Sequence, residues 1–335
     1  MACSRIVLRC NTFSARKPRD SALSALSIIL VNYNGSRDTI ECVRSIEESN
    51  FGEFEIIIVD NGSQAGTVEQ LRAACPHCTV IGVEENIGFA AGNNIGLKEA
   101  LERGGSRFLL LNNDTTIDAS ALSRLMKALE SSDRVGIVGA KIRYFSSRNK
   151  IWYAGGILSL GSGSFHHRGI GEEDLGQYDL GGETQYVTGC CLLFRRQVVD
   201  KIGFLDESYF AYLEDADFCV RARKAGFSIL YEPHALVYHK VSSTSARDSP
   251  VYLYLNLRNK ILFLHKHSRL DQWLPCLPAI AYYYVRQFIR LIFKWRDPKK
   301  VKSAWYGLVD GLAQRTGDHG EGRLQAISVS KGHAF

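Results

Sequence analysis

The chain has 335 residues, of which 45% are hydrophobic and 23% charged, an ordinary globular composition with enough apolar residues for a sizeable core. No apolar run is long and uncharged enough to span a bilayer, and the length fits one large α/β domain with an appendage, or two small domains. The formal net charge of +6 does not indicate a nucleic-acid partner, because the basic residues are concentrated only in the C-terminal third.

Residues 1–25 are rich in serine and arginine and poor in acidic residues. We expect a disordered N-terminal extension here, with an organellar targeting peptide as the alternative. The 9 cysteines are an odd number without a disulfide framework, which favours reduced thiols in a cytosolic protein. Cys75 and Cys78 have zinc-ligand spacing, but no second pair lies at a suitable distance, so we interpret both as structural.

Apolar runs alternate with helical patterns from Leu26 onward. Continuous apolar runs predict buried strands, and apolar residues at helical spacing predict helices. The expected strands are 27–32, 55–59, 79–83 and 107–111, and the expected helices are 36–48, part of 86–103, and 118–131. This alternation implies βαβ units, and therefore an α/β fold with a mostly parallel central sheet flanked by helices.

The second half of the pattern is less regular. Residues 140–185 are rich in glycine, and we expect loops or hairpins close to a functional site. A strand resumes at 186–194, and two short strands at 228–231 and 235–239 are divided by Pro233.

Polar residues follow three of the predicted strands. In a parallel sheet, ligands bind beyond the carboxyl ends of the strands. An ordinary polar turn would explain any one of these strand ends. It explains less well why all three offer carboxylate or amide groups at the same edge of the sheet. The residues are Asn32 and Asn34, then Asp60, then Asn112, Asn113 and Asp114.

A second acidic site lies at the start of a short helix that ends at Gly226, where a left-handed cap is needed. Asp217 and Arg221 are spaced to pair across one helical turn, which would leave Glu214 and Asp215 at the helix mouth. The alternative is that these acids only favour the helix N-terminus. Together with the strand-end site, this arrangement suits a reaction that needs a metal clamp and a base.

Asp114 is the candidate metal ligand. One carboxylate together with substrate phosphate oxygens is the usual way in which Mg²⁺ or Mn²⁺ is held. His239 ends another strand and could be a second ligand, although a histidine there is more often a structural donor. Asp60 could accept a hydrogen bond from a base or a ribose hydroxyl, or could belong to an ordinary Asp-Asn-Gly turn.

The region from Tyr252 to Lys302 is strongly basic. Arg286, Arg290 and Lys294 form a stripe at helical spacing beside apolar residues, and Trp295 follows. This pattern is typical of an amphipathic helix in a membrane interface. The alternative is a helix packed on the main domain with a solvated basic edge. We expect a C-terminal amphipathic helical region at 246–318 and a flexible tail at 319–335.

Several motifs in order resemble glycosyltransferase family 2, which has the GT-A fold, and in particular its rhamnosyltransferase-like bacterial branch. The resemblance covers about residues 26–245. The matching stretches are IILVNYNG at 28–35, IVDNGS at 58–63, ENIGFAAGNNIG at 85–96, LLNND at 110–114, VTGCCLLFRR at 187–196 and GFLDESYFAYLEDADF at 203–218.

The resemblance implies an inverting transfer from a nucleotide-diphospho-sugar, such as a dTDP- or UDP-sugar, to a lipid-linked or glycan acceptor in cell-surface polysaccharide synthesis. Asp215 would be the catalytic base, Asp114 and His239 would hold Mg²⁺ or Mn²⁺, and Glu214, Asp217 and Arg221 would shape the acceptor side. The residues expected to bind the donor are Asn32, Asn34, Asp60, Asn86, Asn112 and Asn113. The enzyme would act in the cytoplasm, as a peripheral protein at the inner face of the membrane.

The sequence departs from the family at Asn112, where many members have aspartate. Fewer charges there weaken the expected metal site, and a non-catalytic nucleotide-sugar-binding protein with the same fold therefore remains an alternative. A nucleotidyltransferase would also share the sheet and the metal, but no basic phosphate-gripping loop follows the first strand. The Gln-x-x-Arg-Trp motif of processive members is absent, which favours addition of one or few sugars.

Overall fold

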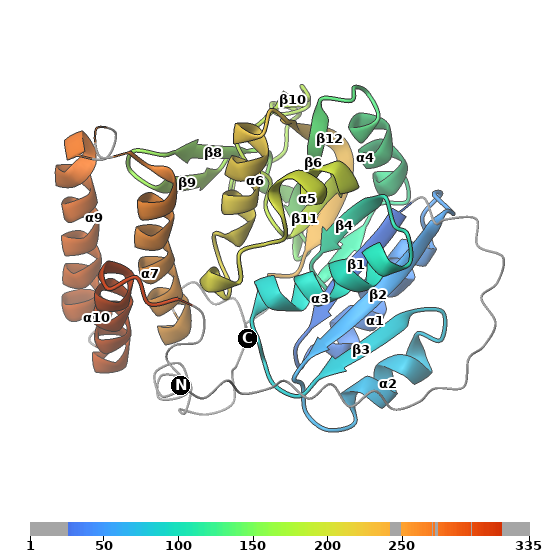
Figure 1. Cartoon of the computed structure of the whole chain (residues 1–335), viewed down its shortest axis with the longest axis horizontal. Helices are drawn as coiled ribbons and strands as arrows, with labels where there is room; N and C mark the ends of the chain where they lie inside the picture. Colours follow the sequence, from blue (N-terminus) through green and yellow to red (C-terminus); the bar gives the residue numbers. More distant parts are fainter. Residues whose placement is uncertain (1–25, 242–248, 270, 272–273, 296, 317–335) are drawn as a thin grey trace.

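The computed structural model describes residues 26–241, 249–269, 271, 274–295 and 297–316 (Figure 1). The expected N-terminal extension, 1–25, and the expected tail, 319–335, lie outside the described residues.

A ten-stranded mixed sheet forms the centre of the molecule, in the order β10-β12-β6-β11-β4-β1-β2-β3, with β5 and β7 joined at the side. The half made of β3, β2, β1 and β4 is parallel, as expected, whereas β11 runs antiparallel to both of its neighbours. The principal strands are β1 (Leu26–Asn32), β2 (Phe54–Asn61), β3 (Thr79–Val83), β4 (Arg107–Leu111), β6 (Val135–Tyr144), β11 (Cys191–Arg195) and β12 (Ser228–His239). The shorter strands are β5 (Thr115–Ile117), β7 (Ser147–Tyr153), β8 (Gly156–Ser159), β9 (Ser164–His167) and β10 (Gly182–Glu183).

Helices cover both faces of this sheet, which explains the continuous apolar strands. Ile28 and Leu30 of β1 belong to one core, whereas Ile29 belongs to the other, because successive side chains of a strand point to opposite faces. The first core includes residues of α1 (Ser36–Glu47), α2 (Thr67–Ala74) and α4 (Ala121–Leu129). The second includes residues of α3 (Phe89–Glu102), α5 (Arg196–Ile202) and α6 (Glu214–Lys224).

The sequence-based predictions were wrong at three strands. The strand expected at 186–194 is β11, which begins only at Cys191. β12 is one strand, with a register shift between Glu232 and Leu236 that accommodates Pro233, which has no N–H for the ladder. The third strand, β6, was not predicted, because its ten residues include two glycines and polar residues that hide the apolar run. It occupies the centre of the sheet between β12 and β11.

Three helices follow the sheet at one end of the molecule (Figure 1): α7 (Pro250–His267), α9 (Leu277–Ile289) and α10 (Pro298–Leu312), with a π-helical turn, η4 (Arg290–Trp295), between the last two. One side of α7 packs on Phe210 and Ala211, just before α6. Its other side packs on α9, η4 and α10 through Leu257, Tyr284 and Leu291. Among the described residues, no helix combines the length and hydrophobicity needed to cross a bilayer.

Candidate active site

A cavity of about 680 Å³ opens at the carboxyl ends of the parallel strands, and both Asp114 and Asp215 line it. The other predicted site residues in its lining are Asn34, Asn86, Asn112, Asn113, Glu214 and His239. The remaining four lie behind the lining: Asn32, Asp60, Asp217 and Arg221. The acidic site at Asp114 and the acidic site at Glu214 and Asp215 therefore line the same cavity, although they are about a hundred residues apart in the sequence.

Asn32 and Asp60 are buried at the ends of β1 and β2, beneath the cavity floor. Asp60 Oδ1 accepts hydrogen bonds from Asn32 Nδ2 at 2.6 Å and from Ser63 Oγ at 2.5 Å. Asn32 Oδ1 in turn accepts from Thr39 Oγ1 at 2.8 Å and from Asn113 Nδ2 at 3.3 Å. This network fixes the ends of three neighbouring strands relative to one another.

Asn61 follows Asp60 at the end of β2 and was given no role among the predicted site residues, but it organises the adjoining wall. Its Nδ2 donates to Asn86 Oδ1 and to the Gly88 carbonyl, both at 3.1 Å, and its Oδ1 accepts from the Ile87 N–H. Gly88 has φ of +91°, and a side chain there would collide with the Phe210 carbonyl. The stretch 86–88 therefore lies close to the loop that precedes α6. Asn61 belongs to the IVDNGS motif, but in the sequence it could not be distinguished from an ordinary asparagine of an Asp-Asn-Gly turn.

Asp114 and His239 lie together across the β5–β12 pairing, with Asp114 Oδ1 3.0 Å from His239 Nε2. The imidazole packs edge-on against Trp152, at 4.6 Å between ring centroids. Two buried atoms at this place have no partner among the described residues, Asn112 Oδ1 and His239 Nδ1. Buried polar atoms are normally satisfied, so these point to a ligand.

The donor set fits a divalent cation. A carboxylate, an amide oxygen and an imidazole suit Mn²⁺, and the oxygens also suit Mg²⁺. The described residues contain no group of three or more His, Cys, Asp and Glu side chains that could hold a metal. An ion here would therefore rely on Asp114, His239 and Asn112, with further ligands from a substrate phosphate and water.

Asp215 lies in the first turn of α6, where its carboxylate receives two backbone donors. The Gly189 N–H donates to Oδ2 at 2.8 Å, and the Ala216 N–H donates to Oδ1 at 2.7 Å. Burial nevertheless raises the pKa of Asp215 above its usual value, against the lowering effect of these N–H groups. A carboxylate with a raised pKa is a stronger base.

Glu214 is buried beside Asp215 and lacks a partner for Oε2 among the described residues. Burial, and then the charge of Asp215, raise its pKa well above the usual value. Asp215 receives two backbone donors that favour its charged form, whereas Glu214 Oε2 has no partner among the described residues, so ionisation is less costly for Asp215 than for Glu214. A helix N-terminus would lower the pKa of both acids, but burial raises the two pKa values by more.

Asp217 does not line the cavity. It binds Arg221 at 2.7 Å, which confirms the predicted pairing across one turn. It also contacts His267 at 2.6 Å and Lys266 at 2.7 Å, both from α7. Burial alone would raise the pKa of Asp217, but these partners outweigh it and lower the pKa to about 2. Arg221 also donates to the Ile202 and Phe204 carbonyls. The Asp217–Arg221 pair therefore ties α6 to α7 and to the segment after α5.

The left-handed cap predicted at Gly226, after the end of α6, is also confirmed, because Gly226 has φ of +94°.

The residues just before α6 adopt an unusual backbone conformation. Phe210, Tyr212 and Leu213 have φ of +64°, +70° and +75°. Such conformations cost about 1–3 kcal/mol each for residues other than glycine and persist only where surrounding contacts hold them. We call residues 208–213 the base loop, because they lead directly to Asp215, the residue predicted from the sequence to be the base.

The far wall of the cavity was largely missed from the sequence. It is aromatic, with Trp152, Phe165 and Tyr186 from the β7–β11 region beside His166 and His167. Tyr252 and Asn256 of α7 complete the rim. The glycine-rich segment was expected near the site, but no local spacing pointed to these particular side chains. Their proximity depends on the antiparallel β8–β9 hairpin and on where α7 packs.

The mixed sheet, with Asp114 just beyond the carboxyl end of β4 and Asp215 in the first turn of α6 lining one cavity, has the architecture of a GT-A glycosyltransferase. Residues 27–203, just over half of the chain, match the family model of glycosyl transferase family 2, and the chain belongs to this family. The sequence-based recognition is thereby confirmed.

Curated relatives extend the likeness. Low-salt glycan biosynthesis hexosyltransferase Agl10 of Haloferax volcanii is 27% identical over 90% of this chain and 95% of its own length. N-acetylglucosaminyl-diphospho-decaprenol L-rhamnosyltransferase of Mycobacterium tuberculosis is 25% identical over 72% of this chain and 85% of its own length. The uncharacterized protein y4gI of Sinorhizobium fredii is 30% identical over 64% of this chain, and the match spans only 24% of y4gI.

Solved structures share the fold. The mannosyltransferase PcManGT from Pyrobaculum calidifontis, in complex with GDP-Man and Mn²⁺, superposes with a TM-score of 0.52. The match covers 89% of this chain and 79% of that one, at 16% sequence identity.

Proposed function

We propose that this protein transfers a sugar from a nucleotide-diphospho-sugar to a hydroxyl of a lipid-linked or glycan acceptor, with inversion at the anomeric carbon. The observation that carries the proposal is that Asp114 and Asp215 line the same cavity. A displacement of this kind needs charge neutralisation at the leaving diphosphate and a base at the incoming hydroxyl, on opposite sides of one reacting carbon.

The donor side is made by the strand ends. We assign Asn86, which lines the cavity, to the nucleoside. Asp60 would act on the nucleoside site from behind the lining, through its network with Asn32 and Asn113, and Asn34 lines the same side. Asp114, His239 and Asn112 would hold Mn²⁺ or Mg²⁺. A bound divalent ion supplies Lewis-acid stabilisation of the charge that develops on the diphosphate. The mannosyltransferase PcManGT, whose structure contains GDP-Man and Mn²⁺, supports this assignment.

The acceptor side is made by α6 and the aromatic wall. Asp215 takes the proton of the acceptor hydroxyl as its oxygen attacks the anomeric carbon, a contribution of about 10²–10⁴-fold in rate. The two N–H donors on its carboxylate fix the orientation of the base. The raised pKa of Glu214 favours its protonated form, in which the unpartnered oxygen can donate a hydrogen bond to a sugar hydroxyl. Trp152 and Tyr186 offer apolar surface to a sugar ring or a lipid headgroup.

The names of the relatives narrow the substrate class. One is a hexosyltransferase of glycan biosynthesis, and another is an L-rhamnosyltransferase that acts on a decaprenol-linked sugar. We therefore propose a hexose or deoxyhexose donor, with rhamnose as a candidate, in cell-surface polysaccharide synthesis.

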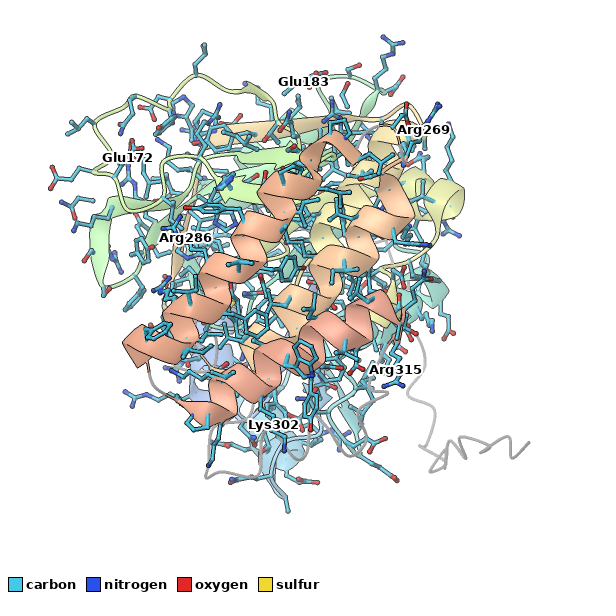
Figure 2. All side chains as sticks on the ribbon, turned by 90° about the vertical axis from the view of Figure 1, so that its left-hand side faces the viewer. Glu172, Glu183, Arg269, Arg286, Lys302 and Arg315 are labelled. Carbon is cyan, nitrogen blue, oxygen red and sulfur yellow. The ribbon has the colours of Figure 1, made fainter. Side chains whose placement is uncertain are left out.

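A lipid-linked acceptor requires access to a membrane, and the C-terminal helices offer a suitable surface. Figure 2 looks onto these helices and shows Arg286 on α9 and Lys302 on α10. Large apolar side chains are exposed on α9, on α10 and on η4 between them. They are Tyr282, Val285, Ile289, Ile292, Phe293, Trp305 and Leu312. We call them the apolar surface and propose that it rests on the inner face of the cell membrane, with the arginines at headgroup depth.

The experiment is a thermal-shift panel of dTDP-, UDP- and GDP-sugars with and without Mn²⁺, followed by transfer to a polyprenyl-diphospho-sugar. A donor that binds only the native state raises the melting temperature by mass action. We expect a shift for one nucleotide class that needs the metal, and an inverted linkage by NMR. Tight nucleotide binding without turnover in any metal would contradict the proposal and favour a non-catalytic binding protein.

A further inference from the structure

We propose that α7 positions the catalytic base, through Asn259 and its neighbour Arg258. This inference rests on the proposed function, because it assumes that Asp215 is the base. The two residues are fully buried and do not line the cavity. They would act on the reaction only through the base loop, 208–213, and are therefore positioning residues.

The side-chain amide of Asn259 contacts three successive parts of the base loop. Its Nδ2 donates to the carbonyls of Tyr209 at 2.9 Å, Ala211 at 2.7 Å and Tyr212 at 2.8 Å. The Arg258 Nη2 donates to the Tyr209 carbonyl at 2.8 Å, and its Nε donates to Asn259 Oδ1 at 2.9 Å. The guanidinium therefore holds the amide in the orientation in which its NH₂ group faces the loop.

Part of the base loop relies on donors from α7. Within the loop, the Ala211 N–H donates to the Tyr209 carbonyl at 2.8 Å. The Ala211 and Tyr212 carbonyls, in a stretch with positive φ at Phe210, Tyr212 and Leu213, accept from Asn259. Buried carbonyls without a partner are costly. On the opposite side, the Ala90 N–H of α3 donates to the Phe210 carbonyl at 3.1 Å. The loop is thus held between α3 and α7.

The position of the loop determines that of Asp215. The Leu213 carbonyl accepts the first intrahelical bond of α6, from the Asp217 N–H at 2.9 Å, and Asp215 lies between these two residues. A misplacement of about 1 Å at a reacting group can cost about 10²-fold in rate. Loss of the Asn259 amide should therefore lower kcat while leaving the donor site, which is built on other strands, intact.

The test compares Asn259→Ala with Leu257→Ala. Leu257 lies on the same helix and is buried, but it packs on α9 and α10 rather than on the loop. We measure kcat, the KM and Kd for the donor, the melting temperature, and amide hydrogen exchange of residues 208–217. Asn259→Ser, which keeps one donor, is the conservative variant and also serves if Asn259→Ala does not fold.

We expect Asn259→Ala to lower kcat by about 30- to 100-fold with an unchanged donor Kd, and to speed exchange in 208–217. Asn259→Ser should recover part of kcat, whereas Leu257→Ala should keep kcat within about threefold despite a lower melting temperature. Equal loss of kcat in Asn259→Ala and Leu257→Ala, or unchanged exchange in 208–217 in the asparagine variants, would overturn the inference. If the wild type transfers no sugar, the proposed function fails instead, and the exchange data still decide whether Asn259 holds the loop.

Discussion

The Gly189 N–H donates to the Asp215 carboxylate at 2.8 Å, which ties the first turn of α6 to the segment that leads into β11. Burial raises the pKa of Asp215 by more than the N–H groups of Gly189 and Ala216 lower it, so that this pKa lies above the ordinary 3.8. The base must be ionised to act. We therefore expect kcat/KM to fall tenfold per pH unit on the acid side, with an apparent pKa above 3.8.

A pH–rate profile at saturating Mn²⁺ measures that acid limb. Circular dichroism at each pH provides the control that the fold persists. Activity that stays level down to pH 4 would contradict a base with a raised pKa.

Asn112 offers a test of the metal site by gain of function. Its unpartnered oxygen lies beside Asp114, and Asn112→Asp adds one negative charge without a change of shape. Added Coulomb attraction should tighten Mn²⁺ binding by about tenfold or more. Calorimetric titration of Mn²⁺ in the presence of donor nucleotide measures this, and Asn149→Asp, at an exposed residue outside the cavity lining, is the control for the added charge. Equal Mn²⁺ affinity in wild type and Asn112→Asp would place the ion elsewhere.

Glu214→Gln should alter the pH dependence of stability. The folded-state pKa of Glu214 is raised above 4.5, so the native state keeps a proton that the unfolded state loses. Stability therefore falls as the pH rises from about 4.5 towards the folded-state pKa. The amide resembles the neutral acid and has no such dependence. We expect the melting temperature of Glu214→Gln relative to wild type to increase between pH 5 and pH 8, and a constant difference would refute the raised pKa.

The membrane proposal depends on the apolar surface. Phe293 is 72% exposed, and Phe293→Ser should weaken binding to vesicles that contain anionic lipid, measured by co-sedimentation. Leu180→Ser is the matched control, because Leu180 is 89% exposed but lies outside the C-terminal helices. Equal loss of binding in both variants, or none in Phe293→Ser, would argue against this surface.

Much of the fold follows from local sequence. β1 to β4 were predicted because strands buried on both faces appear as unbroken apolar runs, and α6 because its acids, basic residues and Gly226 mark both ends. β6 was missed since its glycines and lysine resemble a loop, although Lys141 is buried there by ion pairs with Asp174 and Asp179 from a distant segment.

The site was predictable only where motifs are contiguous. Asp114 and Asp215 could be named from local pattern and resemblance, and tertiary packing brings them to one cavity. Asn259 could not be identified in this way. It looks like an ordinary polar residue in the run YLNLRNKILF, and its role depends on carbonyls about fifty residues earlier in the chain.

The most direct test of the account compares Asp114→Asn with Asp215→Asn for donor binding and for sugar transfer. We expect Asp114→Asn to lose metal-dependent donor binding, and Asp215→Asn to bind donor and Mn²⁺ as the wild type does while transfer falls by about 10²–10⁴-fold. Full transfer by a folded Asp215→Asn, or undiminished metal-dependent donor binding by Asp114→Asn, would contradict the account.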